Sequence, residues 1–178
     1  MRLFRRRPKL PPAARPPLER DERLLAWAAA GNGEGDGVVV ATNLGLWLPG
    51  RSHRIGWHDL VKAVWSGREL TVIPGEPAAE RDGYQLVVDS PAERYLLLDP
   101  GDLPHQVRTR VTRSVAYTQQ HALPGGSGRI VGRRISGVDG LTWMVRLDPG
   151  TPVDDEAVLA ETDRLVAAAR AATTPSDL

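Results

Sequence analysis

The sequence predicts an α+β protein built mainly of antiparallel strands. Short apolar runs separated by glycine, proline and asparagine fill residues 22–98. Apolar residues then recur at every fourth position after Asp102, and an alternating run over 141–147 precedes a second helical pattern. Short runs between turn signals are typical of antiparallel sheets, and a four-residue apolar spacing is typical of an amphipathic helix.

The composition is that of an ordinary globular chain, with 41% hydrophobic and 25% charged residues among 178. The chain has no cysteine, which excludes disulfides, thiolate metal sites and a thiol nucleophile. Its net charge of +1 conceals two basic blocks: residues 1–18 carry six basic residues and no acidic one, and residues 102–138 carry six arginines against one aspartate. Composition and turn signals divide the chain into a flexible basic tail over 1–18, a main unit over 19–123 and an extension over 124–178.

The tail reads MRLFRRRPKLPPAARPPL. Prolines stand where a secretory signal needs about 7–15 apolar residues, and no later run approaches the roughly 20 apolar residues of a membrane span. We therefore expect a cytoplasmic protein with no transmembrane segment. The tail is either a solvated segment without a binding role or a segment that binds an anionic surface such as the inner membrane face. Its predicted membrane or anion contacts are Leu3, Phe4, Arg5, Arg6, Arg7 and Lys9.

The main unit opens with a run over 22–30 that fits either a helix or a buried strand, since its apolar residues follow neither period. The glycine-rich residues 31–37 predict a hairpin connection, and residues 74–83 predict a polar loop. β-Branched and aromatic residues between turn signals predict six strands, over 38–42, 46–48, 60–65, 69–73, 84–89 and 94–98.

A helix is predicted over 103–121, because Asp102 is a good N-cap residue and Pro104 suits the first turn. Its buried stripe would contain Leu103, Val107, Val111 and Val115. In the extension, Asp139-Gly140 predicts a two-residue hairpin turn between strands over 129–138 and 141–147. Trp143 is expected to be buried on the same side as Leu141 and Val145, and the acidic residues 154–156 open a final helix.

Three short motifs of the main unit carry a family resemblance. Thr42-Asn43 closes an apolar strand, Ile55-Gly56-Trp57 follows a second apolar run, and Asp59-Leu60 starts the next strand. Residues 24–121 thereby resemble the bacterial pleckstrin-homology-like and GRAM-like domains, although Gly45 stands where the family usually has arginine. The resemblance implies a barrel of about seven strands, made of two near-orthogonal sheets and capped by a helix, with the hairpin and helix of the extension packed on it.

No pattern of catalytic or metal-binding residues stands out. His53 and His58 are five residues apart in a loop, unlike the helical zinc-protease spacing. His58 and Asp59 are expected to point to opposite faces of a strand. We therefore expect a non-enzymatic protein with no metal and no cofactor.

Two further groups of residues are candidate sites. Trp57, in a polar loop beside His58, is the tryptophan expected to be exposed, and the pair predicts an interface. The second basic block is either a solvated face or a phosphate-contacting patch, and Tyr117 is its only nearby aromatic residue for stacking on bases. That patch consists of Arg108, Arg110, Arg113, Arg129, Arg133 and Arg134.

The sequence favours a cytoplasmic binding or adaptor module, peripheral at the inner membrane face, whose partner is an anionic lipid or an unidentified protein. Two other classes stay open. One is a nucleic-acid-associated protein that uses the basic blocks, and the other is a small enzyme with an unrecognised site.

Overall fold

The computed structural model describes residues 9–31 and 36–174. It confirms a strand-dominated, mainly antiparallel α+β fold, and the strands form an open sheet. The elements are the 3-10 turn η1 (Pro12–Ala14), β1 (Leu24–Gly31), β2 (Asp36–Thr42), β3 (Gly45–Trp47), β4 (Ile55–Gly56), β5 (Leu60–Trp65), β6 (Glu69–Arg81), β7 (Tyr84–Asp89), β8 (Glu93–Leu98), α1 (Leu103–Ser114), β9 (Val115–Leu123), β10 (Gly126–Arg133), β11 (Thr142–Leu147) and α2 (Glu156–Thr173).

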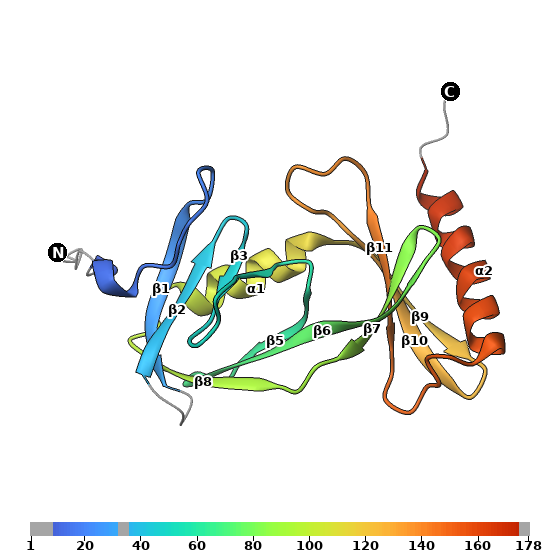
Figure 1. The fold of residues 1–178 in the computed structure, drawn as a ribbon, viewed down its shortest axis with the longest axis horizontal. Coiled ribbons are helices and arrows are strands. Elements are labelled where there is room, and N and C mark those ends of the chain that lie inside the picture. Colours follow the sequence, from blue (N-terminus) through green and yellow to red (C-terminus); the bar gives the residue numbers. More distant parts are fainter. Residues whose placement is uncertain (1–8, 32–35, 175–178) are drawn as a thin grey trace.

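The strands follow the order β4-β3-β2-β1-β8-β6-β7-β11-β10-β9, and β5 pairs with β6. Among the described strands every pairing is antiparallel except that of β11 with β7. The molecule is elongated, with one lobe around β1 to β4 and α1 and another around β9 to β11 and α2 (Figure 1).

The long strand β6 joins the two lobes. Its first half pairs with β5 on one side and β8 on the other, and its second half pairs with β7. β7 and β8 are successive partners of β6, separated by residues 90–92. The backbone N–H of Ser90 donates to the carbonyl of Pro74 at 2.9 Å across this gap. One continuous hairpin therefore runs the length of the molecule and fixes the lobes against each other.

The first lobe packs β1 to β5, the first half of β6 and β8 around α1. The run over 22–30 forms the strand β1, which alternates buried and half-exposed residues and pairs with β2 as a hairpin. The largest fully buried side chains of this core are Leu46, Leu60, Leu70, Leu103 and Val107.

The second lobe has its own core between α2 and the strands β7, β9, β10 and β11. Trp143 and Val145 are buried in it and Leu141 packs against it, which confirms the prediction for this strand. Strand β7, from within the predicted main unit, contributes Tyr84 and Leu86. The predicted division between 123 and 124 falls in the turn that joins β9 to β10.

The predicted helix over 103–121 is too long. It ends at Ser114, and Val115 begins β9, which pairs with β10. Val107 is buried as predicted, whereas Val111 is only partly buried and Val115 is half-buried in the strand. The four-residue spacing of the valines fits a helix, but it carries no information about pairing with distant residues. Residues from Val115 onward form a strand because they hydrogen-bond to β10.

Two predicted connections also differ. Residues 74–83 are not a loop, since β6 continues to Arg81 and pairs with β7. The hairpin between β10 and β11 does not turn at Asp139-Gly140 alone, because β10 ends at Arg133 and residues 134–141 form a longer connection. The tight turn instead joins β9 to β10, where Gly125 adopts a φ of 72°.

Replacement of Asp155 by alanine is expected to lower the free energy of unfolding by about 1 kcal/mol, the usual effect of removing an N-cap. The Asp155 carboxylate accepts the backbone N–H groups of Ala157 and Val158, both at 3.0 Å, at the start of α2. Urea denaturation would measure the change, and Asp154→Ala is the matched control because Asp154 makes no such bond. Equal stability of both variants would contradict a capping role.

Candidate anion-binding site

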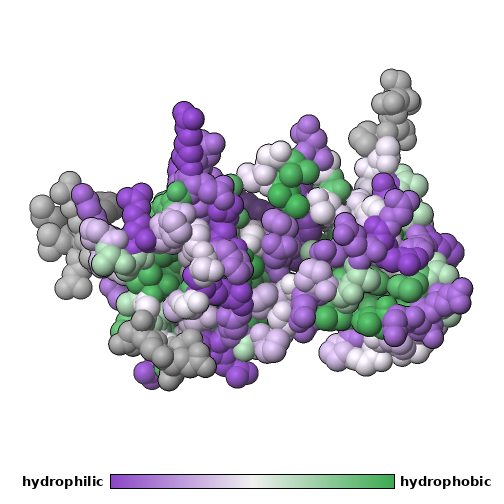
Figure 2. All heavy atoms as spheres, viewed as in Figure 1, coloured by the Kyte–Doolittle hydropathy of each residue, from purple (hydrophilic) through white to green (hydrophobic). Residues whose placement is uncertain are grey.

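Four segments of the chain meet around a pocket of about 220 Å³ at the C-terminal end of α1. The first lobe contributes the turn after β2 and the residues around β4, α1 contributes its last turn, and the connection from β10 to β11 contributes its first residues. Hydrophilic residues cover the middle of the molecule between the two lobes (Figure 2). The basic lining of the pocket consists of Arg54, His58, Arg110, Arg113 and Arg134.

Positive charge in this pocket is largely unopposed. Among the described residues that line it there is no aspartate or glutamate. The side chains of Arg110, Arg113 and Arg134 form no hydrogen bond or ion pair with any described residue, and Nε of Arg110 is buried without a partner. Arg54 differs, because its Nη1 lies 2.8 Å from Glu19 Oε1 and 3.1 Å from Glu22 Oε2. We call the three unpaired arginines, 110, 113 and 134, the arginine cluster.

Helix geometry and one backbone hydrogen bond assemble the arginine cluster. Arg110 and Arg113 are three residues apart and so are neighbours on α1, where Arg110 lies two turns after Leu103 on the side that faces the core. The N–H of Arg134 donates to the carbonyl of Ser114 at 2.7 Å. This bond ties the start of the 134–141 connection to the last residue of α1 and brings Arg134 beside the helix arginines.

Trp57 and His58 also line this pocket, but not as predicted. The expectation that Trp57 is exposed is wrong: it is 6% exposed, and its Nε1 donates to the carbonyl of Thr42 at 3.0 Å. His58 is half-buried, with Nε2 3.4 Å from Asp59 Oδ2. The expected opposite orientation of His58 and Asp59 is therefore also wrong, because they lie in a turn before β5. Gly56 permits this turn, since a Cβ there would collide with the His58 ring.

A buried carboxylate supports the Arg54 side of the pocket. Glu22 Oε1 accepts hydrogen bonds from Thr42 Oγ1 at 2.7 Å and from Trp47 Nε1 at 2.9 Å. Burial raises the pKa of Glu22, but these bonds, the N–H of Glu19 and the charge of Arg54 together outweigh burial and lower it. The hydrogen bond to Glu19 is the largest cause that raises the pKa of Arg54. Sequence reasoning missed Arg54, whose only signal was its place beside Ile55-Gly56-Trp57.

The remaining arginines of the predicted patch lie elsewhere. Arg133 is 4% exposed and donates to Ser114 Oγ at 2.6 Å and to the Leu60 carbonyl at 3.1 Å; burial lowers its pKa. Arg129 is exposed and donates to Thr118 Oγ1 at 3.2 Å, and Arg108 lines a groove beside β5. The structure thus brings together only half of the predicted patch.

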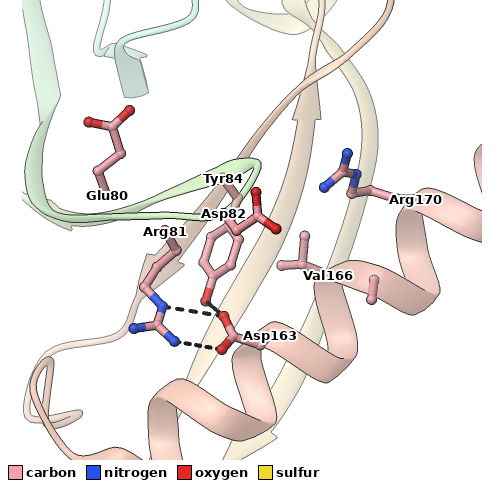
Figure 3. Close-up of a pocket in the computed structure, with 8 residues that line it drawn as sticks. Glu80, Arg81, Asp82, Tyr84, Asp163, Val166 and Arg170 are labelled. Carbon is pink, nitrogen blue, oxygen red and sulfur yellow. Dashed lines mark hydrogen bonds and ion pairs between the residues drawn. The ribbon is translucent and has the colours of Figure 1, made fainter.

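A second pocket, of about 540 Å³, lies between α2 and the turn from β6 to β7 (Figure 3). The carboxylate of Asp163 accepts from Arg81 Nη2 at 2.6 Å and from Tyr84 Oη at 2.7 Å. The ion pair with Arg81 is the largest cause that lowers the pKa of Asp163, and burial raises that of Tyr84. Asp163, Arg81 and Tyr84 hydrogen-bond to one another, and these bonds hold α2 against the β6–β7 hairpin.

The predicted tail contacts Leu3, Phe4, Arg5, Arg6 and Arg7 lie outside the described residues, and Lys9 is exposed. Over residues 9–31 and 36–174, no three histidine, aspartate or glutamate side chains gather as a metal-ligand set. Neither α-helix of this part combines the length and the apolar character that crossing a bilayer requires. Comparisons of the chain with protein-family models, curated proteins and solved structures find no match.

Proposed function

We propose that the protein is a non-enzymatic, pleckstrin-homology-like binding module that works at the cytoplasmic face of a membrane and holds anionic groups there. The observation that carries this proposal is the arginine cluster, in which three unpaired guanidinium groups, two from α1 and one from the connection after β10, line one pocket. Guanidinium groups prefer planar or tetrahedral oxyanions, to which they donate two hydrogen bonds at once.

The pleckstrin-homology-like assignment has support from element order. Seven strands, β1 to β6 and β8, form the first lobe, and α1 follows them and packs into their core. Thr42 and Asn43 of the resemblance have structural roles: Thr42 bonds Glu22, and Asn43 Oδ1 accepts the N–H of Arg23. Gly45 stands in place of the family's arginine because a Cβ there would collide with the carbonyl oxygen of Ile55.

Binding suits the pocket better than catalysis. Ser114, a hydroxyl beside the arginine cluster, donates to the carbonyl of Val111 at 2.7 Å and accepts from Arg133, so it is held as a structural group. A nucleophile needs a base within hydrogen-bond reach, and no such base is bonded to Ser114 among the described residues. The pocket instead offers fixed positive charge, which attracts an anion and requires no proton transfer.

The basic tail would add membrane affinity to that of the pocket. Each basic residue close to an anionic bilayer contributes up to about 1 kcal/mol. The tail carries Arg2, Arg5, Arg6, Arg7 and Lys9, for a sum of at most about 5 kcal/mol that salt and chain ordering reduce. Binding of this strength is reversible, and the prolines at 8–17 would keep the folded part close to the surface.

Replacement of Arg5, Arg6 and Arg7 by serine is expected to abolish co-sedimentation of the protein with vesicles rich in anionic lipid. The melting temperature should not change, because the substitutions leave every residue of the two cores unaltered. The matched control removes three exposed basic residues of the folded part, Lys62, Arg68 and Arg164, and should retain most of the binding.

Failure of the wild-type chain to sediment with such vesicles at low salt would overturn the membrane proposal. A gel shift with RNA or DNA, with a salt dependence that reports the phosphates neutralised, would instead support the nucleic-acid alternative. Equal loss of vesicle binding in both variants would show that net charge, and not the tail, carries the attraction.

A further inference from the structure

We infer that the pocket at the end of α1 holds a single phosphate group, which terminates a larger ligand and is gripped by Arg110, Arg113 and Arg134. This inference rests on the proposed function and names the chemistry of its ligand. It starts from the charge and the unused hydrogen-bond donors of the pocket.

The side-chain donors of the arginine cluster have no acceptors among residues 9–31 and 36–174. A buried hydrogen-bond donor normally has a partner, yet Nε of Arg110 is buried with none. Each guanidinium presents five N–H groups, and none of those of Arg113 or Arg134 bonds a described residue. An oxyanion in the pocket would supply acceptors to all three side chains at once.

The arginine side chains do not serve as hydrogen-bonding caps for the C-terminus of α1. Cations at a helix C-terminus interact favourably with the free carbonyl groups of the last turn. Here three of those carbonyls have other donors: Val111 O accepts Ser114 Oγ, Thr112 O accepts the N–H of Val115, and Ser114 O accepts the N–H of Arg134. The three arginines therefore line one pocket without a side-chain hydrogen bond or ion pair to any described residue, an arrangement that an anion stabilises.

The number of guanidiniums and the size of the pocket favour a phosphate monoester over other anions. A phosphate monoester has three terminal oxygens and carries up to two negative charges near neutral pH, which matches three cationic groups better than a carboxylate does. The volume of about 220 Å³ is below the roughly 300–1,000 Å³ of pockets that enclose whole small molecules. Only the phosphate would enter, and the rest of the ligand would stay outside.

The pocket walls disfavour recognition of a nucleobase. Base binding in single-stranded nucleic acid relies on exposed aromatic faces. Trp57 is the aromatic residue of this pocket, but it is 6% exposed and its indole N–H is bonded to the Thr42 carbonyl. Asn43 is likewise engaged, since its amide group bonds Arg23 N–H and the Asp21 carbonyl. The unengaged guanidinium groups of this pocket are therefore suited to bind phosphate and not a nucleobase.

Isothermal titration calorimetry of the full chain with inorganic phosphate, and with acetate at equal ionic strength, tests the inference. We expect phosphate to bind and acetate to bind at least about ten-fold more weakly. The R110Q/R113Q variant should lose about 100-fold in phosphate affinity, as roughly ten-fold or more accompanies each lost charged hydrogen bond. R68Q/R108Q is the control, because it removes the same charge from exposed positions outside the pocket and should bind normally.

Melting temperatures, measured with and without phosphate, distinguish a variant that has lost only the binding site from one that has lost the fold. Without phosphate, R110Q/R113Q should melt at the same temperature as the wild type or higher, because the substitutions relieve repulsion between like charges. With phosphate, only the wild type and the control should gain melting temperature. Equal phosphate affinity in all three proteins, or no affinity in the wild type, would overturn the inference.

Vesicles distinguish the two sources of the phosphate. Phosphatidic acid presents a terminal phosphate monoester, whereas phosphatidylglycerol presents a diester with one charge. If the ligand is a lipid headgroup, the protein should prefer phosphatidic acid at matched surface charge, and R110Q/R113Q should lose that preference. Binding of inorganic phosphate without any vesicle binding would support the pocket inference, assign it to a soluble phosphorylated compound, and overturn only the membrane proposal.

Discussion

Replacement of Trp143 by alanine is expected to lower the free energy of unfolding by about 3–5 kcal/mol, the usual effect of emptying an aromatic site in a core. Trp143 is 6% exposed and lies in the core of the second lobe, where its ring meets that of Tyr117 edge to face at a centroid distance of 5.4 Å. Such aromatic pairs add about 0.5–1.5 kcal/mol beyond the area they bury.

The indole ring of Trp143 packs over a glycine of the neighbouring strand, so its removal opens a cavity there. Gly132 of β10 stands opposite Trp143 of β11 on one side and opposite Tyr117 of β9 on the other. A Cβ on Gly132 would lie 3.3 Å from Cη2 of Trp143, so the indole ring occupies the space over the glycine. With the indole removed, this part of the sheet presents bare backbone, and a void in a closely packed interior loses the contacts on one side entirely.

Urea denaturation monitored by circular dichroism would measure the effect. Val138→Ala is the control, because Val138 lies in the 134–141 connection and is 52% exposed; its truncation should change stability by less than about 0.5 kcal/mol. A loss below about 1 kcal/mol for Trp143→Ala would mean that the second lobe tolerates the void and that its core is not tightly packed.

Local signals in the sequence were sufficient for several strands of the first lobe and for the start of α1, but they left the run over 22–30 open between helix and strand and did not predict β4. The glycine-rich segment after residue 30 lies in the hairpin between β1 and β2, and α1 begins directly after Asp102. The hairpin depends on turn chemistry within a few residues, whereas α1 begins at the predicted place although the side chain of Asp102 makes no capping hydrogen bond. The alternation around Trp143 likewise identified the face of β11 that packs in the core of the second lobe, although Met144 on the opposite face is also buried, against Val87 and Val131.

The features that the sequence did not predict depend on pairing between segments that are distant in the chain. Val115 to Leu123 fits a helix by its valine spacing, and becomes a strand because β10 supplies a ladder of hydrogen bonds. The polar second half of β6 becomes a strand because β7 folds back on it. The candidate site has the same origin: helix spacing places Arg110 beside Arg113, but only the bond between Arg134 N–H and Ser114 O brings the third arginine to them.

Glu22→Ala is the second substitution with a large expected effect, a loss of about 3–5 kcal/mol, typical of removing one member of a buried charged network. The Glu22 carboxylate accepts from Thr42 Oγ1, Trp47 Nε1 and the N–H of Glu19, and its Oε2 lies 3.1 Å from Arg54 Nη1. Alanine would leave the buried indole N–H of Trp47 without its acceptor, and such an unsatisfied donor alone costs about 1–3 kcal/mol.

Glu19→Ala is the matched control, because Glu19 pairs with the same Arg54 atom at 2.8 Å but its side chain is 63% exposed. An exposed ion pair contributes about 0–1 kcal/mol, so this variant should remain nearly as stable as the wild type. Urea denaturation at neutral pH would compare the two, and equal losses would show that Glu22 acts through Arg54 alone and not through Thr42 and Trp47.

The stabilisation by Glu22 is also expected to depend on pH in one direction. Its pKa in the folded protein is below the ordinary value of 4.5, so the unfolded chain binds the proton more tightly. The contribution is therefore fully present above the unfolded pKa and is lost as the pH falls through the folded pKa. Denaturation from pH 7 to pH 3 should show the difference in unfolding free energy between wild type and Glu22→Ala narrowing below about pH 4.5. A difference that stays constant over this range would mean that the size of the side chain, and not its charge, stabilises the lobe beside the arginine cluster.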